Sequence, residues 1–208
     1  EKVTYHNFEI VVVDAGTHSE ADQQCFDALS SAYDTFSVLQ WNEPINRPKI
    51  ANFAAEQTEG EFLLFVNGDA RILSDDAIEV LLGYFQSPEV GIVGPKQLFV
   101  DGTIEHAGIV VGGTRVVTPL FRHLPSSWRG YFSEELALFY GDVDFCLKVR
   151  HAGYLTVYTP FVELGHLKST TRLRIHSKEL RIKRRREIAY LQSAWPEVFI
   201  EGDAFGNP

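Results

Sequence analysis

Two short apolar runs that each lead to an acidic residue constrain the fold of this chain more than any other feature. The first run covers residues 8–14 and ends at Asp14, and the second covers residues 61–66 and is followed closely by Asp69. Short, continuous apolar runs of this kind are typical of parallel strands covered on both faces. Because ligands bind beyond the carboxyl ends of such strands, we expect both carboxylates to line one crevice.

Helix and strand patterns alternate along the rest of the chain. We expect helices over residues 20–32, 49–58, 75–85, 141–152 and 174–195, with Gly60 capping the second. We expect further strands over residues 37–40, 90–93 and 155–158, and a hairpin over residues 98–111 around Asp101-Gly102. This alternation predicts an α/β fold in which helices cover both faces of a mostly parallel central sheet.

Charge and cysteine content narrow the function classes. The 208 residues include 28 acidic and 19 basic side chains, so a nucleic-acid partner is not expected. An acidic protein that binds a nucleotide diphosphate needs a metal ion or a few well-placed cations. The two cysteines are interpreted as buried thiols of a reducing compartment, which predicts a cytoplasmic location.

The chain is interpreted as one domain over residues 1–208, with a C-terminal helix and tail over residues 174–208. Its length suits a single packed core. No apolar run approaches the roughly 20 residues that span a bilayer, so no transmembrane segment is predicted. The chain begins at Glu1 and contains no Met, which suggests an excised domain or a sequence with pieces missing.

The Asn67-Gly68-Asp69 segment is the first candidate site. Carboxylate oxygens at the end of a strand suit Mg²⁺ or Mn²⁺, which share their ligands with substrate phosphates. Asn, Gly and Asp are also common turn residues, so a simple turn explains the segment equally well.

Two acidic residues, Asp142 and Asp144, fall at the start of a predicted helix. Carboxylates there are stabilised by the helix dipole, so one of them can act only as a cap. The other can accept the proton of an incoming hydroxyl group. The two roles can be divided between the two residues.

Three other segments have open interpretations. His166, within residues 165–169, is a metal ligand, a phosphate donor or a structural histidine. His106 follows the Asp101-Gly102 turn and by itself indicates only a hairpin. The basic run 181–186 is a solvated helix face or, alternatively, docks on an anionic membrane.

Taken in order, five stretches resemble family 2 glycosyltransferases of the GT-A fold, especially their rhamnosyltransferase-like branch. They are FEIVVVDAGT, NFAAEQTEGEFLLFVNGD, VGIVGPKQLFVDGTIEHAGIVVG, YGDVDFCLKVRHAGYLTVYTPFVELGH and the closing WPEVFIEGDAFGNP. The resemblance implies a GT-A-like, Rossmann-like sheet. It also implies that the chain lacks the family's first strand, and Gly141 stands where the family has an acidic residue.

The resemblance assigns roles to particular residues. Asp142 corresponds to the catalytic base, with Asp144 as the alternative. Asp69 and His166 correspond to metal ligands for Mn²⁺ or Mg²⁺. The residues expected to bind the nucleotide-sugar donor are Asp14, Asn67, Asp69, His106 and Ser169, and Asp101 lies with His106 in the hairpin near the acceptor.

The function implied by the resemblance is inverting, metal-dependent transfer of a hexosyl or rhamnosyl group from a nucleotide-diphosphate sugar to a hydroxyl group. The acceptor would be a glycan or lipid-linked molecule in polysaccharide or glycan assembly, and the basic helix could meet the inner membrane face. One alternative is a catalytically inactive module that binds sugar nucleotides or glycans. A nicotinamide-dependent oxidoreductase is disfavoured because no G-x-G-x-x-G follows the first strand.

Overall fold

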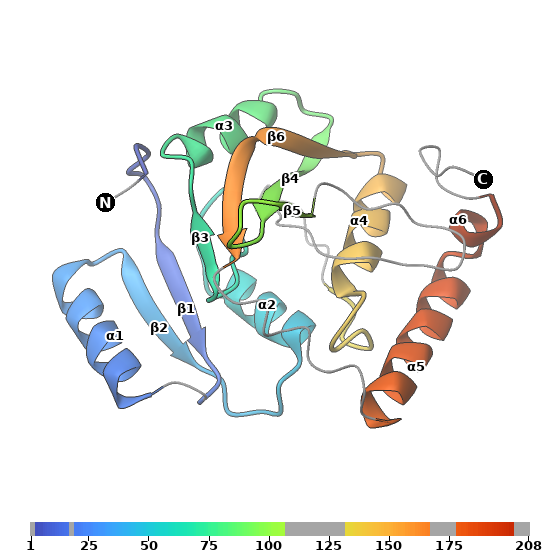
Figure 1. Cartoon of the computed structure of the whole chain (residues 1–208), viewed down its shortest axis with the longest axis horizontal. Coiled ribbons are helices and arrows are strands. Elements are labelled where there is room, and N and C mark those ends of the chain that lie inside the picture. The colour runs from blue at the N-terminus through green and yellow to red at the C-terminus, as the bar shows by residue number, and fades with distance from the viewer. Residues whose placement is uncertain (1–2, 17–18, 107–131, 167–177, 202–208) are drawn as a thin grey trace.

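The computed structural model describes residues 3–16, 19–106, 132–166 and 178–201, and in these residues the strands form two sheets (Figure 1). The smaller sheet pairs β1 (Ile10–Asp14) with β2 (Phe36–Gln40) in parallel. The larger sheet has the order β3-β6-β4-β5. Its strands are β3 (Ala70–Ile72), β4 (Val90–Leu98), β5 (Ile104–His106) and β6 (Leu155–His166).

The parallel pair of β4 and β6 forms the centre of the larger sheet and is covered on both faces. On one face, Val93 packs with residues of α3 (Ala77–Tyr84). On the other face, Ile92 packs against Phe145 of α4 (Gly141–His151). Successive strand residues point to opposite faces, so the alternation of Ile92 and Val93 places one helix on each side. The α/β class, the mostly parallel pairing and the helices on both faces are thus confirmed.

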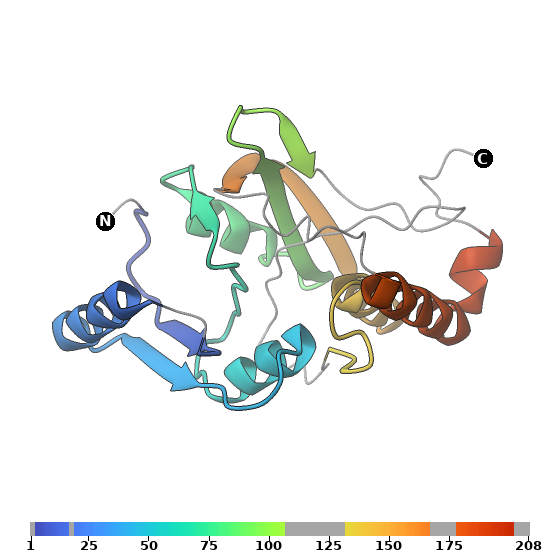
Figure 2. The ribbon, with the colours of Figure 1, turned by 60° about the horizontal axis from the view of Figure 1, so that its bottom comes forward.

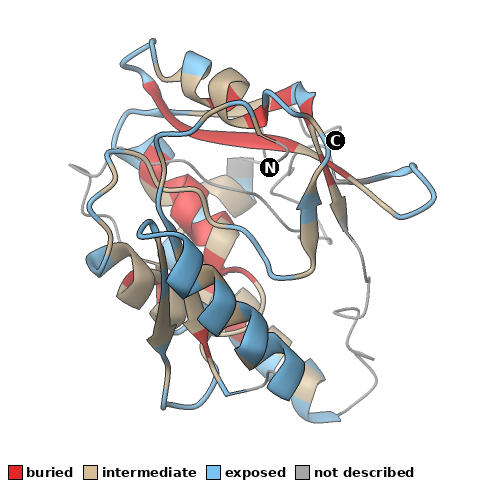
Figure 3. Ribbon diagram, turned by 90° about the vertical axis from the view of Figure 1, so that its left-hand side faces the viewer, coloured by how far each residue is buried: buried red, intermediate tan, exposed pale blue. Residues whose placement is uncertain are grey.

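The smaller sheet packs with α1 (Glu20–Ala32) and α2 (Arg47–Glu56). The predicted bounds of α1 are confirmed, and Ser19 begins the helix with a capping box that includes Asp22. The strand expected from the apolar run 8–14 is present as β1, but the expected burial of this strand is not confirmed. Val11 to Val13 are only half-buried, and Figure 3 shows α1 as largely exposed.

The predicted buried strand over residues 61–66 is wrong. Apart from a single bridge position at Phe62, the segment belongs to no strand, and its apolar side chains are half-buried or exposed. A strand is stabilised by a neighbour that takes up its backbone hydrogen bonds. No described strand forms a ladder with residues 63–66. This apolar segment therefore has an irregular backbone, although its sequence is typical of a strand.

Helix α5 (Lys178–Ala194) and helix α6 (Pro196–Glu201) close the described chain. Leu191 of α5 is fully buried in a cluster with Leu136, Tyr140, Val143 and Leu147. The sequence interpretation missed α6, because its six residues are too few to show a helical period. None of the helices described combines the length and apolarity needed to cross a membrane.

The structure also differs from the sequence predictions at the ends of α2 and at one of the two cysteines. Helix α2 begins two residues earlier than predicted, because Asn46 accepts a hydrogen bond from the backbone N–H of Lys49 at 3.2 Å. It ends before Gln57, so Gly60 is not its cap. Cys146 is buried as predicted, but Cys25 is exposed on α1.

Candidate active site

One end of the fold gathers most of the predicted site residues. In Figure 1 the arrows of β1, β2 and β6 all point toward the lower edge, and α4 begins at that edge. Figure 2 turns this edge toward the viewer. Asp14 ends β1, and Asp142 lies in the first turn of α4. Strand β1 belongs to the smaller sheet and α4 packs on the larger one, so these two acidic residues lie toward one end of the fold and not at the edge of a single sheet.

Asp14 is almost completely buried at the end of β1, with 5% of its surface exposed. Its Oδ1 accepts a hydrogen bond from the backbone N–H of Gly16 at 2.8 Å. Gly16 has φ of 72°, a conformation that favours glycine. The backbone carbonyl of Asp14 also accepts from Trp41 N at 2.8 Å. Asp14 is thus held rigidly by the turn that follows its strand.

The Asn67-Gly68-Asp69 segment forms a turn that leads into β3. The backbone N–H of Ala70 donates to the carbonyl of Asn67 at 3.0 Å. Asn67 is exposed and Asp69 is half-buried. Ala70 is paired with His166 in the antiparallel register of β3 and β6, so Asp69 adjoins the backbone of His166. The turn interpretation is confirmed, and it is compatible with a ligand role for Asp69.

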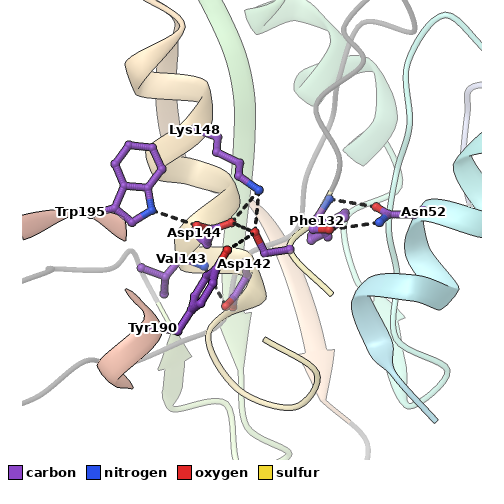
Figure 4. A network of polar contacts seen from close by, with 9 residues as sticks. Asn52, Phe132, Asp142, Val143, Asp144, Lys148, Tyr190 and Trp195 are labelled. Carbon is purple, nitrogen blue, oxygen red and sulfur yellow. Dashed lines mark hydrogen bonds and ion pairs between the residues drawn. The ribbon is translucent and has the colours of Figure 1, made fainter. Parts of the chain in front are cut away.

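The two acidic residues of α4 have different surroundings (Figure 4). Asp142 is half-buried, and its Oδ1 accepts from the backbone N–H of Val143 at 2.9 Å. Asp144 is 1% exposed and is engaged by three donors. Its Oδ1 accepts from Trp195 Nε1 at 2.9 Å, and its Oδ2 lies 2.8 Å from Ser133 Oγ and 2.9 Å from Lys148 Nζ. Of the two, Asp142 has the more exposed side chain.

Gly141 occupies a tight position immediately before Asp142. A Cβ atom there would lie 3.1 Å from Pro48 Cγ and 3.4 Å from the carbonyl oxygen of Leu136. An acidic side chain at this position would therefore force one of these neighbours to move. The glycine noted in the sequence suits the close approach of α2 to the start of α4.

The hairpin between β4 and β5 is confirmed over its described residues. Asp101 Oδ1 accepts from the backbone N–H and the hydroxyl of Thr103, at 2.9 and 2.6 Å. These hydrogen bonds hold the pKa of the Asp101 carboxyl below its usual range. His106 is paired with Gln97 in the strand register. Asp101 thus has a clear structural role in the turn.

Some predictions fall beyond what the structure describes. Ser169 lies outside the described residues, and His106 and His166 are placed only by their backbone pairing. Within the described ranges, no three His, Cys, Asp or Glu side chains converge in a way that would hold a metal ion. Of the predicted metal ligands, Asp69 lies next to the backbone of His166, through the pairing of Ala70 with His166.

The sequence interpretation missed the residues that support α4. No role was predicted for Ser133, Lys148, Trp195 or Asn52, although all but Ser133 lie in stretches that resemble the family, and their partners lie 4 to 80 positions away in the chain. It also missed Gln97, which is 4% exposed in β4 and whose Oε1 has no hydrogen-bond partner among the described residues. A polar residue inside an apolar strand was the one available indication.

Two curated relatives match most of this chain but are much longer. An uncharacterized protein, y4gI, of Sinorhizobium fredii is 31% identical over 93% of this chain and 25% of its own length. The O-antigen biosynthesis protein RfbC of Myxococcus xanthus is 31% identical over 81% of this chain and 16% of its own length. The chain thus spans a quarter or less of the length of either relative.

Solved structures support the fold. A mannosyltransferase of Pyrobaculum calidifontis, PcManGT, in complex with GDP-Man and Mn²⁺, superposes with a TM-score of 0.58 at 14% identity, covering 91% of this chain and 54% of that one. At this identity the likeness shows the GT-A fold alone. The model of the family "Glycosyl transferase family 2" matches residues 1–138, up to the loop before α4. The chain therefore belongs to glycosyltransferase family 2.

Proposed function

We propose that this chain is an inverting, metal-dependent glycosyltransferase domain that moves a sugar from a nucleotide-diphosphate donor to an acceptor hydroxyl. Family membership supports sugar transfer. PcManGT, which has the same fold, carries GDP-Man and Mn²⁺. RfbC, by its name, acts in O-antigen biosynthesis, which supports a role in polysaccharide assembly. Transfer of a hexosyl or rhamnosyl group is the finer form of this proposal.

The donor would lie along the carboxyl ends of the strands. In this proposal Asp14 contacts the nucleoside, and Asn67, His106 and Ser169 contribute to donor binding. Asp69 and His166 fit a divalent cation, because a half-buried carboxylate adjoins a histidine backbone at one sheet edge. Mg²⁺ and Mn²⁺ complete their shells with water and phosphate oxygens, so few protein ligands suffice. When bound, the cation would stabilise the negative charge of the diphosphate.

Asp142 would act on the acceptor. Its carboxylate takes the proton of the acceptor hydroxyl while the oxygen attacks the anomeric carbon. The bond from that carbon to the diphosphate oxygen breaks, and the nucleoside diphosphate leaves with the bonding electron pair. Attack from the face opposite the leaving group inverts the anomeric configuration, and no covalent enzyme intermediate forms.

The support for the proposal is that Asp142 is half-buried in the first turn of α4, which begins at the end of the fold toward which β1 and β6 run, and that Asp14 and His166 are the last residues of these two strands. The test is transfer from nucleotide-sugar donors with Mn²⁺ present. Asp142→Asn should lower kcat by about 100-fold or more while donor binding persists. Asp27→Asn, on the exposed part of α1, is the matched control and should leave kcat unchanged. Full activity of Asp142→Asn would refute the assignment.

A second candidate is a catalytically inactive module that binds sugar nucleotides. Gly141 favours it, since the family's acidic residue is absent and its space is filled by Pro48 and Leu136. Calorimetry with UDP, GDP and dTDP sugars, followed by a turnover assay on the same samples, separates the two functions. Tight binding without turnover would support the module.

We also propose a lipid-linked or glycan acceptor and a cytoplasmic location at the inner membrane face. Support comes from the exposed thiol of Cys25 and from exposed basic residues of α5. Five cations of this helix are exposed: Lys178, Arg181, Lys183, Arg185 and Arg186. Each basic residue near an anionic surface contributes about 1 kcal/mol. Co-sedimentation with phosphatidylglycerol vesicles, lost at high salt, would support this; no binding at low salt would refute it.

A further inference from the structure

We propose that Trp195 and Asp144 are positioning residues that fix the first turn of α4 and thereby aim Asp142 at the acceptor hydroxyl. The inference rests on the proposed function, because aiming Asp142 matters only if that carboxylate is the base. It divides the two acidic residues of α4 between two roles. Asp142 would meet the substrate, while Asp144 would hold the helix from inside the protein.

The start of α4 lacks the local support that α1 and α2 have. Ser19 caps α1 and Asn46 caps α2 through their side chains, whereas Tyr140 at the start of α4 makes no side-chain cap. A side-chain cap satisfies backbone donors and fixes the direction in which a helix begins. The direction of α4 must therefore be set by contacts from elsewhere in the fold.

Asp144 makes such contacts with both of its oxygens. Oδ1 accepts from the indole N–H of Trp195, and Oδ2 accepts from the Ser133 hydroxyl and pairs with Lys148. Ser133 Oγ in turn accepts from Lys148 Nζ at 2.7 Å and lies 3.5 Å from Tyr190 OH. Because only 1% of Asp144 is exposed, these hydrogen bonds act where water competes little. The network joins α4 to the preceding loop and to α5.

Trp195 holds α4 at two places. Its indole N–H reaches Asp144 in the first turn, and its ring makes an edge contact with His151 in the last turn, with centroids 5.8 Å apart. Its own backbone N–H donates to the carbonyl of Leu191, which is fully buried. Trp195 therefore connects the buried face of α5 to the whole length of α4.

The loop on the other side of Asp144 is equally restrained. Asn52 of α2 donates to the carbonyl of Phe132 at 3.1 Å and accepts from its N–H at 2.9 Å. The ring of Phe132 stacks on Phe145, with centroids 4.4 Å apart. Ser133 follows Phe132 directly. The contacts of Phe132 with Asn52 and Phe145 therefore also fix the position of the Ser133 hydroxyl that donates to Asp144. Three separate parts of the chain thus determine where α4 begins (Figure 4).

The first experiment compares Trp195→Phe with Tyr84→Phe in the complete chain. Trp195→Phe removes the donor to Asp144 but keeps an aromatic ring against His151. Tyr84→Phe removes one comparable hydrogen bond, to Thr159 Oγ1 at 3.0 Å, in the separate cluster of α3 and β6. Both variants are measured for transfer kinetics and for hydrogen exchange of the backbone amides in the first turn of α4.

Trp195→Phe should lower kcat about tenfold or more, with the KM for the donor changed less than about twofold, because a misaimed base affects only the transition state. Exchange of the Val143 and Asp144 amides should become about tenfold faster. Tyr84→Phe should change neither quantity. Asp144→Asn, which keeps the shape of the side chain but not its charge, should act like Trp195→Phe.

The outcomes separate the two proposals. Unchanged exchange at Val143 and Asp144 in Trp195→Phe would overturn the positioning role, whether or not the chain transfers sugar. A normal kcat in Trp195→Phe, when Asp142→Asn is inactive, would overturn it as well and leave the base assignment intact. Full activity of Asp142→Asn would instead remove the proposed function, and faster exchange alone would then show only a structural role.

Discussion

Strands β1 and β4 have similar apolar sequences but very different surroundings. The first four residues of β1, Ile10 to Val13, are exposed or half-buried, whereas Val90 to Val93 of β4 are all buried. Strand β4 has a partner on each edge and a helix on each face, whereas β1 has one ladder partner, β2. Helix α1 contributes no buried residue. Burial of a strand thus depends on its neighbours, and stability should be concentrated around β4, β6 and α4.

The largest expected effect comes from the core beside β4. Phe145 is fully buried between Ile92 and Phe132, so Phe145→Ala should lower the free energy of unfolding by about 3–5 kcal/mol. Val12→Ala in β1 removes a half-buried side chain and should cost about 1 kcal/mol. Urea unfolding of both variants checks the comparison, and equal losses would contradict it.

The packing of α4 on β4 can be tested at a glycine. A Cβ on Gly91 would lie 2.7 Å from Val149 Cγ1 and 2.8 Å from Tyr154 Cβ, so Gly91→Ala should cost about 1–3 kcal/mol. Gly83 of α3 is exposed, and a Cβ added to it would meet no atom within 4 Å. Gly83→Ala should therefore stabilise the protein by about 0.5–1 kcal/mol. Thermal unfolding measures the change in stability of both variants. A Gly91→Ala variant that is as stable as the parent or more so would show that the contact at Gly91 is not tight.

The smaller sheet should depend on local capping. Ser19 accepts from the backbone N–H of Asp22, and the Asp22 carboxylate accepts from Ser19 N at 2.8 Å. Ser19→Ala should cost about 1 kcal/mol. Because α1 has no buried residue, faster hydrogen exchange should stay within α1 and spare α4. Faster exchange across both helices would indicate that the two regions unfold as one unit.

The smallest effect concerns pH. Burial raises the pKa of Glu187 above its usual 4.5, although its carboxylate accepts from the backbone N–H groups of Leu138 and Phe139. The folded state therefore holds this proton more tightly than the unfolded state does. The resulting stabilisation is complete below pH 4.5 and is lost as pH rises through the raised pKa. Glu187→Gln should flatten this part of the stability–pH curve, measured by urea unfolding, and an unchanged slope would contradict the assignment.

The predictions from sequence succeeded where local chemistry decides the structure. The Asp101-Gly102 turn acts within a few residues and placed the hairpin, and α1 and β2 lie within one residue of their predicted bounds. The strand predicted over residues 61–66 failed because a strand also needs a partner, which no local pattern reveals. Helix α6, whose Val198 and Phe199 pack against the cluster around Leu191, was missed because six residues are too few to show a helical period.

The sequence alone was enough to determine that this is an acidic α/β domain with carboxylates at strand and helix ends. It also indicated a family whose membership was then confirmed. Tertiary structure decided which of those carboxylates faces inward. Asp144 and Trp195 are 51 positions apart, and only the packing of α5 against α4 brings indole and carboxylate to 2.9 Å. Patterns in sequence report interactions between near neighbours, whereas the surroundings of Asp142 and Asp144 depend on chain segments that meet only in the folded protein.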